Sequence, residues 1–147
     1  MKKKTLEIKK TIVLVGGCFD ILHSGHISFL ENAKKEGDLL FLLLESDQNI
    51  KKKKGSSRPI NNQKNRTKAL LDLKIIDRII LLPEMGGDED YDLLIKEIKP
   101  NVIAITTGDE AFDKKSKQAK SVGAKLVEVI NLIPNQSTTR ILKSSRV

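Results

Sequence analysis

Five short apolar runs, separated by polar and amphipathic stretches, dominate the pattern of this chain. They cover residues 12–15, 39–44, 78–82, 102–105 and 125–130. The continuous runs over residues 12–15 and 39–44 are typical of strands that are covered on both faces of a parallel sheet. Between them, apolar residues recur at helical spacing, in segments 24–37, 61–73, 90–99 and 112–122, and a last helix is expected from Ser137. Strands that alternate with helices predict an α/β fold, a Rossmann-like doubly wound parallel five-stranded sheet.

Length and composition limit the chain to one domain. Its 147 residues, 39% of them hydrophobic, are enough for one core. No apolar run is long enough to span a membrane, and the first residues lack the apolar segment of a signal peptide. The single cysteine fits a reducing compartment, so we expect a cytoplasmic protein with no membrane partner.

The net charge of +8 is concentrated in two segments. Residues 1–10 hold five lysines and one glutamate, and residues 51–54 are four consecutive lysines, so the rest of the chain is neutral. We therefore expect a basic N-terminal arm over residues 1–10, a domain over residues 11–147, and a polar, basic loop over residues 51–59. With one Tyr and no Trp, few side chains can stack on bases, so no nucleic-acid partner is expected.

The first predicted strand leads into a glycine turn and the only two histidines of the chain. Gly16 and Gly17 allow the backbone to turn and to approach a ligand closely. His23 and His26 follow at the start of a predicted helix, whose free N–H groups and dipole favour anions. Either feature alone is usually only a turn or a cap, but together they predict phosphate chemistry. Cys18 is open to two interpretations, a reactive thiol and a small buried residue, and the second is favoured.

The same residues resemble a known family. His23-Ser24-Gly25-His26 matches the HxGH signature of the nucleotidyltransferase superfamily, in its cytidylyltransferase-like branch. Residues 16–23 most resemble the adenylyltransferase domain that makes ADP-heptose from heptose 1-phosphate. The resemblance extends from about residue 12 to about residue 143. The nucleotide-binding positions that it implies here are Gly16, Gly17, Cys18, Phe19, Asp20 and Gly25.

Four later segments are similar to elements of the same family. They are Lys54-Gly55 with Arg58-Pro59, the helix position of Arg66, Gly108-Asp109, and Ser137-Thr138-Thr139. Two positions depart from the family pattern: Lys64 stands in place of an acidic residue and Thr106 in place of a lysine. These departures concern the acceptor, whereas the nucleotide-binding elements are intact.

The resemblance implies transfer of a nucleoside monophosphate from a nucleoside triphosphate to a phosphorylated small molecule, with release of pyrophosphate. By this resemblance His23 and His26 bind the α- and β-phosphates, and Lys54 and Arg66 contact the acceptor and the triphosphate. Arg58, Gly108, Asp109, Ser137, Thr138 and Thr139 complete the implied nucleotide site. Mg²⁺ is expected to accompany the triphosphate, without a dedicated set of protein ligands.

Several alternatives stay open at this point. Heptose 1-phosphate with ATP is the first choice of substrates, glycerol 3-phosphate with CTP the second, and FMN with ATP the third. A hypothesis of another class is a nucleotide-binding module without catalysis, which the intact histidine pair disfavours. A homodimer is implied only by the family.

Overall fold

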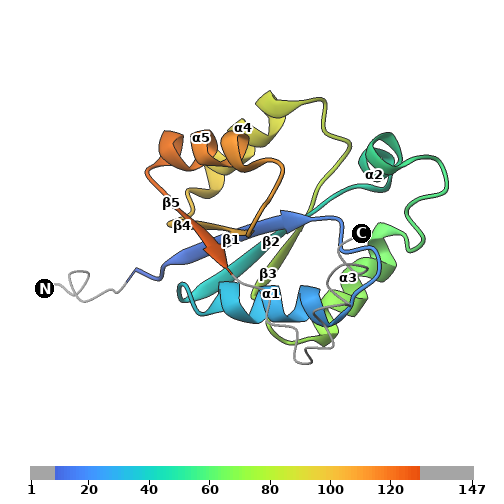
Figure 1. Ribbon diagram of the computed structural model, residues 1–147, viewed down its shortest axis with the longest axis horizontal. Coiled ribbons are helices and arrows are strands. Elements are labelled where there is room, and N and C mark those ends of the chain that lie inside the picture. Colours follow the sequence, from blue (N-terminus) through green and yellow to red (C-terminus); the bar gives the residue numbers. More distant parts are fainter. Residues whose placement is uncertain (1–8, 130–147) are drawn as a thin grey trace, which may run out of the picture.

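The structure, a computed structural model, describes residues 9–129 as one parallel sheet between two layers of helices (Figure 1). The strands are β1 (Ile12–Gly17), β2 (Leu39–Leu44), β3 (Arg78–Leu81), β4 (Val102–Thr106) and β5 (Lys125–Val129). The helices are α1 (Ser24–Lys34), α2 (Asp47–Lys54), α3 (Gln63–Asp72), α4 (Asp88–Ile98) and α5 (Phe112–Val122). The strand order is β3-β2-β1-β4-β5. The prediction of a Rossmann-like five-stranded parallel sheet is confirmed.

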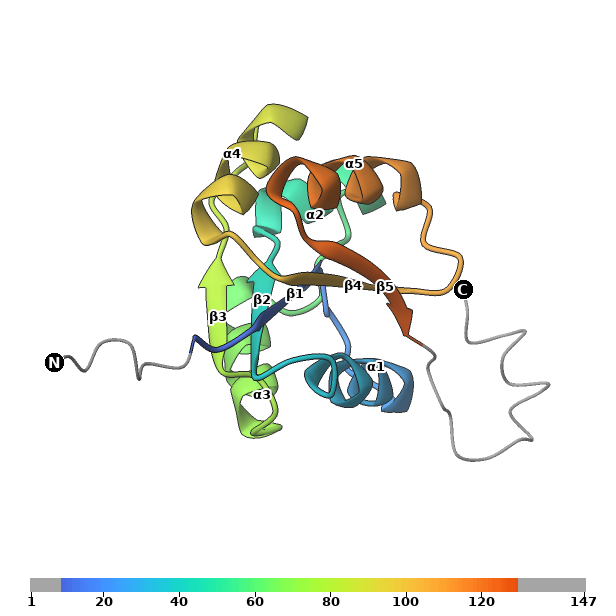
Figure 2. The same ribbon diagram turned by 90° about the vertical axis from the view of Figure 1, so that its left-hand side faces the viewer.

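Each face of the sheet has its own hydrophobic core. Helices α1 and α3 cover one face, and α4 and α5 cover the other (Figure 2). Along β1, Val13 and Val15 belong to the first core, with Leu70 of α3, while Leu14 belongs to the second, with Ile95 of α4. Successive side chains of a strand point to opposite faces, so a fully apolar strand fills both cores.

The predicted strands agree with the structure to within two residues inside its described part. Strand β1 continues through Gly17, two residues beyond the predicted end, and β3 ends at Leu81. Helix α4 begins at Asp88 rather than at residue 90. The helix predicted from Ser137 and most of the predicted N-terminal arm lie outside the described residues.

The basic loop expected over residues 51–59 is wrong in its first part, because residues 51–54 are the last turn of α2. Two features outside the lysine run stabilise this helix. The hydroxyl of Ser46 accepts a hydrogen bond from the Asn49 amide at 3.1 Å and so caps the first turn. Ile50 is completely buried and anchors the helix to the body of the protein.

Strand β1 pairs with β2 on one side and with β4 on the other. In open α/β sheets of this kind, ligands bind in the crevice outside the carboxyl ends of the strands where the chain changes direction along the sheet. This crevice lies after β1, where the glycine turn leads into the two histidines. The fold therefore places the predicted phosphate site at its topological switch point.

A pair of leucines tests the two-layer packing. Leu42 is fully buried in β2, whereas Leu93 of α4 is 66% exposed. Because Leu42→Ala leaves a cavity in the core, we expect the free energy of unfolding to fall by roughly 2–5 kcal/mol. For Leu93→Ala, the same chemical change on the surface, we expect a change within about 0.5 kcal/mol. Urea unfolding measures both, and equal losses would contradict the packing described here.

Candidate active site

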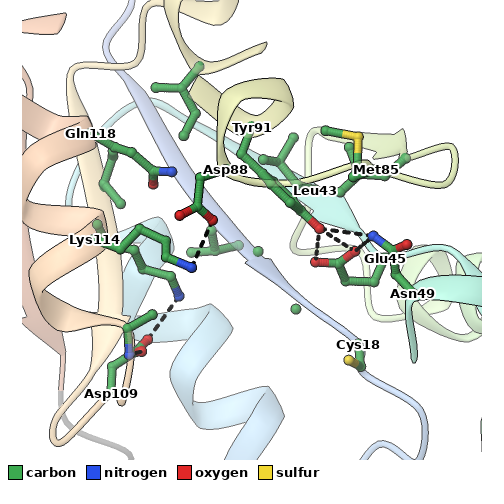
Figure 3. A pocket seen from close by; sticks show the side chains of 18 of the residues that line it. Cys18, Leu43, Glu45, Asn49, Met85, Asp88, Tyr91, Asp109, Lys114 and Gln118 are labelled. Carbon is green, nitrogen blue, oxygen red and sulfur yellow. Dashed lines mark hydrogen bonds and ion pairs between the residues drawn. The ribbon is translucent and has the colours of Figure 1, made fainter. Parts of the chain in front are cut away.

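Two cavities open at the carboxyl ends of the strands. The histidine cavity, of about 830 Å³, is lined by His23, His26, Lys54 and Arg58 among others. The Glu45 cavity, of about 740 Å³, is lined by residues of β2, α2, α4 and α5 (Figure 3). The two cavities share a wall formed by Gly16, Gly17, Cys18, Ala104, Thr106, Asp109 and Lys115. A ligand in one cavity therefore borders directly on the other.

The structure brings most of the predicted site residues together. The histidine cavity is lined by Gly16, Gly17, Cys18, Phe19, Asp20, His23, Gly25, His26, Lys54, Arg58 and Asp109. Gly108 lines the Glu45 cavity. Arg66 lines neither of these two cavities, and Ser137, Thr138 and Thr139 lie outside the described residues.

The two histidines form a stacked pair at the N-terminus of α1. Their ring centroids are 4.0 Å apart and the ring planes differ by 24°. His23 caps the helix, because its Nδ1 accepts a hydrogen bond from the Gly25 amide at 3.0 Å. Neutral His23 therefore carries its proton on Nε2, where it can donate to a ligand. Phe19 packs against His26 with a centroid distance of 5.2 Å.

His26 is uncharged at neutral pH in this arrangement. Burial, the neighbouring His23 and the ammonium group of Lys54 lower its pKa to about 4. The Nδ1 atom of His26 is buried and has no hydrogen-bond partner among the described residues. A neutral imidazole still offers one N–H to a phosphate oxygen, and an incoming anion would favour its protonation.

Asp20 holds the turn after β1 against the segment that precedes α3. Its carboxylate accepts hydrogen bonds from Arg58 Nε and from the amides of Ile60 and Asn61, each at 2.8 Å. Burial alone would raise the pKa of Asp20, but these hydrogen bonds outweigh it and the pKa is lowered. Asp20, which the resemblance implies at the nucleotide, lines the histidine cavity, and its carboxylate holds Arg58 there.

Arg66 is a fully buried side chain that connects the strand ends. It donates to the carbonyl oxygens of Cys18 at 2.9 Å, Glu45 at 3.0 Å and Asn61 at 2.9 Å. Its remaining contact is an ion pair with Asp47 at 2.6 Å. The resemblance implies a contact of Arg66 with the acceptor or the triphosphate; in this structure its guanidinium makes four hydrogen bonds to the protein and lines neither cavity.

At the other end of the shared wall, Asp109 is held in place by its own neighbours. Its carboxylate accepts from the Ala111 amide at 2.7 Å and pairs with Lys115 at 2.9 Å. Gly108 precedes it with a φ of 82°, a left-handed conformation that favours glycine. The Gly-Asp pair thus forms a tight turn after β4 that brings Lys115 to both cavities.

Sequence reasoning missed the polar residues of the Glu45 cavity. Glu45 directly follows β2 at the carboxyl edge of the sheet, a position that offered a signal. Asn49 and Tyr91 reach the same point from α2 and α4. Nothing in their sequence spacing indicates this, because the tertiary packing of three elements brings them together.

The protonation of His26 is directly measurable, because the chain has only two histidines. By NMR titration of the imidazole protons, we expect a midpoint near pH 4 for His26. In the His23→Asn variant this midpoint should rise, since one charge that lowers the pKa of His26 is removed. A midpoint near 6.5 in the ligand-free protein would contradict the burial described here.

The same shift has a consequence for stability, with a fixed sign. The folded pKa lies below the unfolded value of 6.5, so the contribution of neutral His26 to stability is complete above that pH and is lost as the pH falls toward 4. In urea unfolding, the wild type should therefore lose more stability between pH 7 and pH 5 than the variant His26→Gln.

Arg66→Met tests the structural role of the buried guanidinium. Because the substitution removes the hydrogen bonds that Arg66 donates to three carbonyl groups and to Asp47, we expect a loss of roughly 3–5 kcal/mol in the free energy of unfolding. Arg78→Met, at an exposed position on β3, is the matched control and should cost less than about 1 kcal/mol. Unchanged stability together with a loss of ATP affinity would instead indicate direct phosphate contact.

Comparison with known proteins gives related sequences along nearly the whole chain. A family model described as cytidylyltransferase-like matches residues 14–147. The bifunctional protein HldE of Campylobacter fetus is 40% identical over 134 residues, which are 90% of this chain and 27% of that protein. HldE of Pseudomonas entomophila is 36% identical over 139 residues, 93% of this chain and 28% of that protein. The chain spans about a quarter of the length of these curated relatives.

Solved structures share the fold of this chain. The lipopolysaccharide core biosynthesis protein of Thermoplasma volcanium matches with a TM-score of 0.70 and 29% identity, over 85% of this chain and 100% of that chain. A pantoate-beta-alanine ligase of Francisella tularensis, 18% identical with a TM-score of 0.63 over 88% of this chain and 63% of that one, is similar in fold alone. Because the family model covers residues 14–147, the chain belongs to the cytidylyltransferase-like family of nucleotidyltransferases, as the histidine motif predicts.

Proposed function

We propose that this chain transfers AMP from ATP to a sugar phosphate of the heptose 1-phosphate class and releases pyrophosphate. The observation that carries the proposal is the stacked pair His23 and His26 at the N-terminus of α1, in a cavity that Lys54 and Arg58 also line. Helix N–H groups, two imidazoles and two cations on one crevice suit a polyphosphate. Its volume of about 830 Å³ accommodates a nucleotide.

The chemistry needs no nucleophile from the protein. A phosphate oxygen of the acceptor, already an anion, forms the new bond to the α-phosphorus of ATP. The bond between the α-phosphorus and the bridging oxygen breaks, and its electrons leave with pyrophosphate. Catalysis then consists of positioning and charge stabilisation. His23 Nε2–H and an N–H of His26 are the donors proposed for the α- and β-phosphates, and Lys54 and Arg58 balance the charge of the leaving group.

Mg²⁺ is proposed to arrive with the triphosphate. Residues 9–129 contain no group of three or more His, Cys, Asp or Glu side chains that could hold a metal ion. The histidines, Lys54 and Arg58 at the histidine cavity offer nitrogen groups suited to phosphate. The two carboxylates that line the same cavity, Asp20 and Asp109, are paired with Arg58 and Lys115. The ion would neutralise phosphate charge, and every protein contact proposed here is made to the phosphates themselves.

Two observations favour ATP and heptose 1-phosphate over the other substrate pairs. Residues 16–23 resemble the ADP-heptose-forming domain, and the curated relatives at 36–40% identity are HldE proteins. Glycerol 3-phosphate with CTP and FMN with ATP are less favoured. The final nucleotide contacts that the resemblance assigns to Ser137, Thr138 and Thr139 remain part of the proposal.

The proposal extends to the cellular setting of the enzyme. Within residues 9–129, no helix has the length and apolarity that a membrane span requires. A cytoplasmic location and a homodimer stay predictions, as does the lack of a nucleic-acid partner.

Pyrophosphate release tests the proposal, with ATP and CTP each offered heptose 1-phosphate, glycerol 3-phosphate and FMN. We expect release with ATP and heptose 1-phosphate. In His26→Ala, kcat should fall by roughly 100-fold or more, because a donor to the reacting phosphates is lost. Lys35→Ala, at the far end of the same helix, is the control and should keep full activity.

The other outcomes separate the alternatives. Release with a different pair would keep the transfer chemistry and replace the substrates. No release from any pair, with ATP still bound in calorimetry, would favour a non-catalytic nucleotide-binding module. Near-normal turnover in His26→Ala would contradict the role of the histidine pair.

A further inference from the structure

The Glu45 cavity contains a buried polar cluster that the histidine chemistry does not use. Glu45 follows β2 and is 6% exposed, Asn49 lies on α2 and is also 6% exposed, and Tyr91 comes from α4. Their polar groups converge at one side of the cavity (Figure 3). A carboxylate is costly to bury, so its hydrogen-bond partners require explanation.

The donors within the cluster do not satisfy its acceptors. The Tyr91 hydroxyl lies 2.9 Å and 2.8 Å from the two carboxylate oxygens of Glu45, but it has a single proton to donate. Asn49 Nδ2 lies at 3.3 Å from one of these oxygens and Lys53 Nζ at 3.5 Å from the other, both long contacts. A carboxylate accepts about four hydrogen bonds, so this one has capacity left.

A second acceptor in the same cluster has no donor. Asn49 Oδ1 is buried and accepts no hydrogen bond from any residue within 9–129. Burial and the adjacent Glu45 raise the pKa of Tyr91, so its hydroxyl keeps its proton and donates it to the Glu45 carboxylate in a hydrogen bond. Since Asn49 Oδ1 is itself covered, the acceptor that the cluster offers to a ligand is the Glu45 carboxylate, which has capacity for further donors.

The charges around the cavity decide which donors fit. Lys52, Lys53, Lys114 and Lys115 also line it, which disfavours a cationic ligand such as an amine. Hydroxyl groups bring donors without charge. Leu43, Met85 and Ile95 give the cavity an apolar side on which the carbon skeleton of a polyol can pack.

A metal ion is a poorer occupant. Two of the other carboxylates that line the cavity are already paired, Asp88 with Lys114 and Asp109 with Lys115, both at 2.9 Å. Glu45 and Glu110 would be the carboxylates left, and the described residues form no group of three potential metal ligands. Polyhydroxyl recognition is the chemistry that the cluster fits.

We propose that Glu45 binds the hydroxyl groups of the phosphorylated acceptor and that Tyr91 positions its carboxylate. The inference rests on the proposed function, in which the acceptor phosphate attacks the nucleotide in the adjoining cavity. The wall shared by the two cavities sets the geometry: the phosphate of the acceptor lies at Gly16, Gly17 and Lys115, and its hydroxyls extend to Glu45. Glu45 is thus a specificity residue for a polyol phosphate, such as a sugar phosphate.

Glu45→Gln tests this, because it preserves the shape of the side chain and removes its charge. With ATP and heptose 1-phosphate, we expect KM for the sugar phosphate to rise roughly 10- to 100-fold while KM for ATP stays the same. Glu97→Gln, the same change at an exposed position of α4, is the matched control. Tyr91→Phe should raise the KM for the sugar phosphate by roughly 2- to 10-fold with kcat unchanged. If Glu45→Gln does not fold, this second variant tests the role of the cluster.

A binding measurement makes the test independent of turnover. Calorimetry with a non-hydrolysable ATP analogue present compares heptose 1-phosphate with ethyl phosphate, a probe without hydroxyls. The wild type should prefer heptose 1-phosphate, and Glu45→Gln should lose most of that preference. An equal preference in both proteins, or no binding of heptose 1-phosphate to the wild type, would overturn the inference.

The two proposals fail in different ways. Hydroxyl-dependent binding without pyrophosphate release would support the role of Glu45 and contradict the proposed transferase activity. Normal release in which Glu45→Gln behaves as wild type would support the transferase and overturn the role of Glu45.

Discussion

The geometry of this site depends on one buried guanidinium. Arg66, with a side chain that is 0% exposed, donates to the backbone at the ends of β1 and β2 through Cys18 O and Glu45 O. A buried cation is unfavourable unless its donors are satisfied, and here three carbonyls and one carboxylate accept from it. Arg66 therefore fixes the directions in which the chain leaves both strands. The positions of the histidine turn and of Glu45 therefore depend on the same guanidinium.

A buried carboxylate complements this cation on the other side of the turn. Asp20 binds the amides of Ile60 and Asn61, and Arg66 binds the carbonyl of the same Asn61. Between them the turn is tightly packed, since a Cβ on Gly17 would lie 2.9 Å from the Phe19 ring. A turn held from two sides keeps its imidazoles in place before a ligand arrives. Catalysis by positioning requires such preorganisation.

The sequence predicts the fold well because its strands carry an unambiguous signal. Runs rich in aliphatic residues mark all five strands, and the glycines and histidines mark the crevice after β1. Helix α2 was missed because its lysine run is polar all round, whereas the helix depends on one cap and one buried isoleucine. The role of Arg66 was not predictable either, because its partners lie as many as 48 residues away in the sequence. Contacts of that kind exist only after the sheet has formed.

The two cavities differ in the hydrogen-bonding groups that they offer, and this difference explains how one crevice can orient two substrates. The histidine cavity presents donors, from the imidazoles, Lys54 and Arg58, whereas the Glu45 cluster presents acceptors. Phosphate oxygens are acceptors and sugar hydroxyls are also donors, so a sugar phosphate has a preferred orientation across the shared wall. The reversed orientation would place its phosphate beside the carboxylate of Glu45, an acceptor that has no proton to donate. Because four lysines also line the Glu45 cavity, the preference between the two ends of the acceptor follows from hydrogen bonding at Glu45, and the reacting phosphate is directed toward the nucleotide.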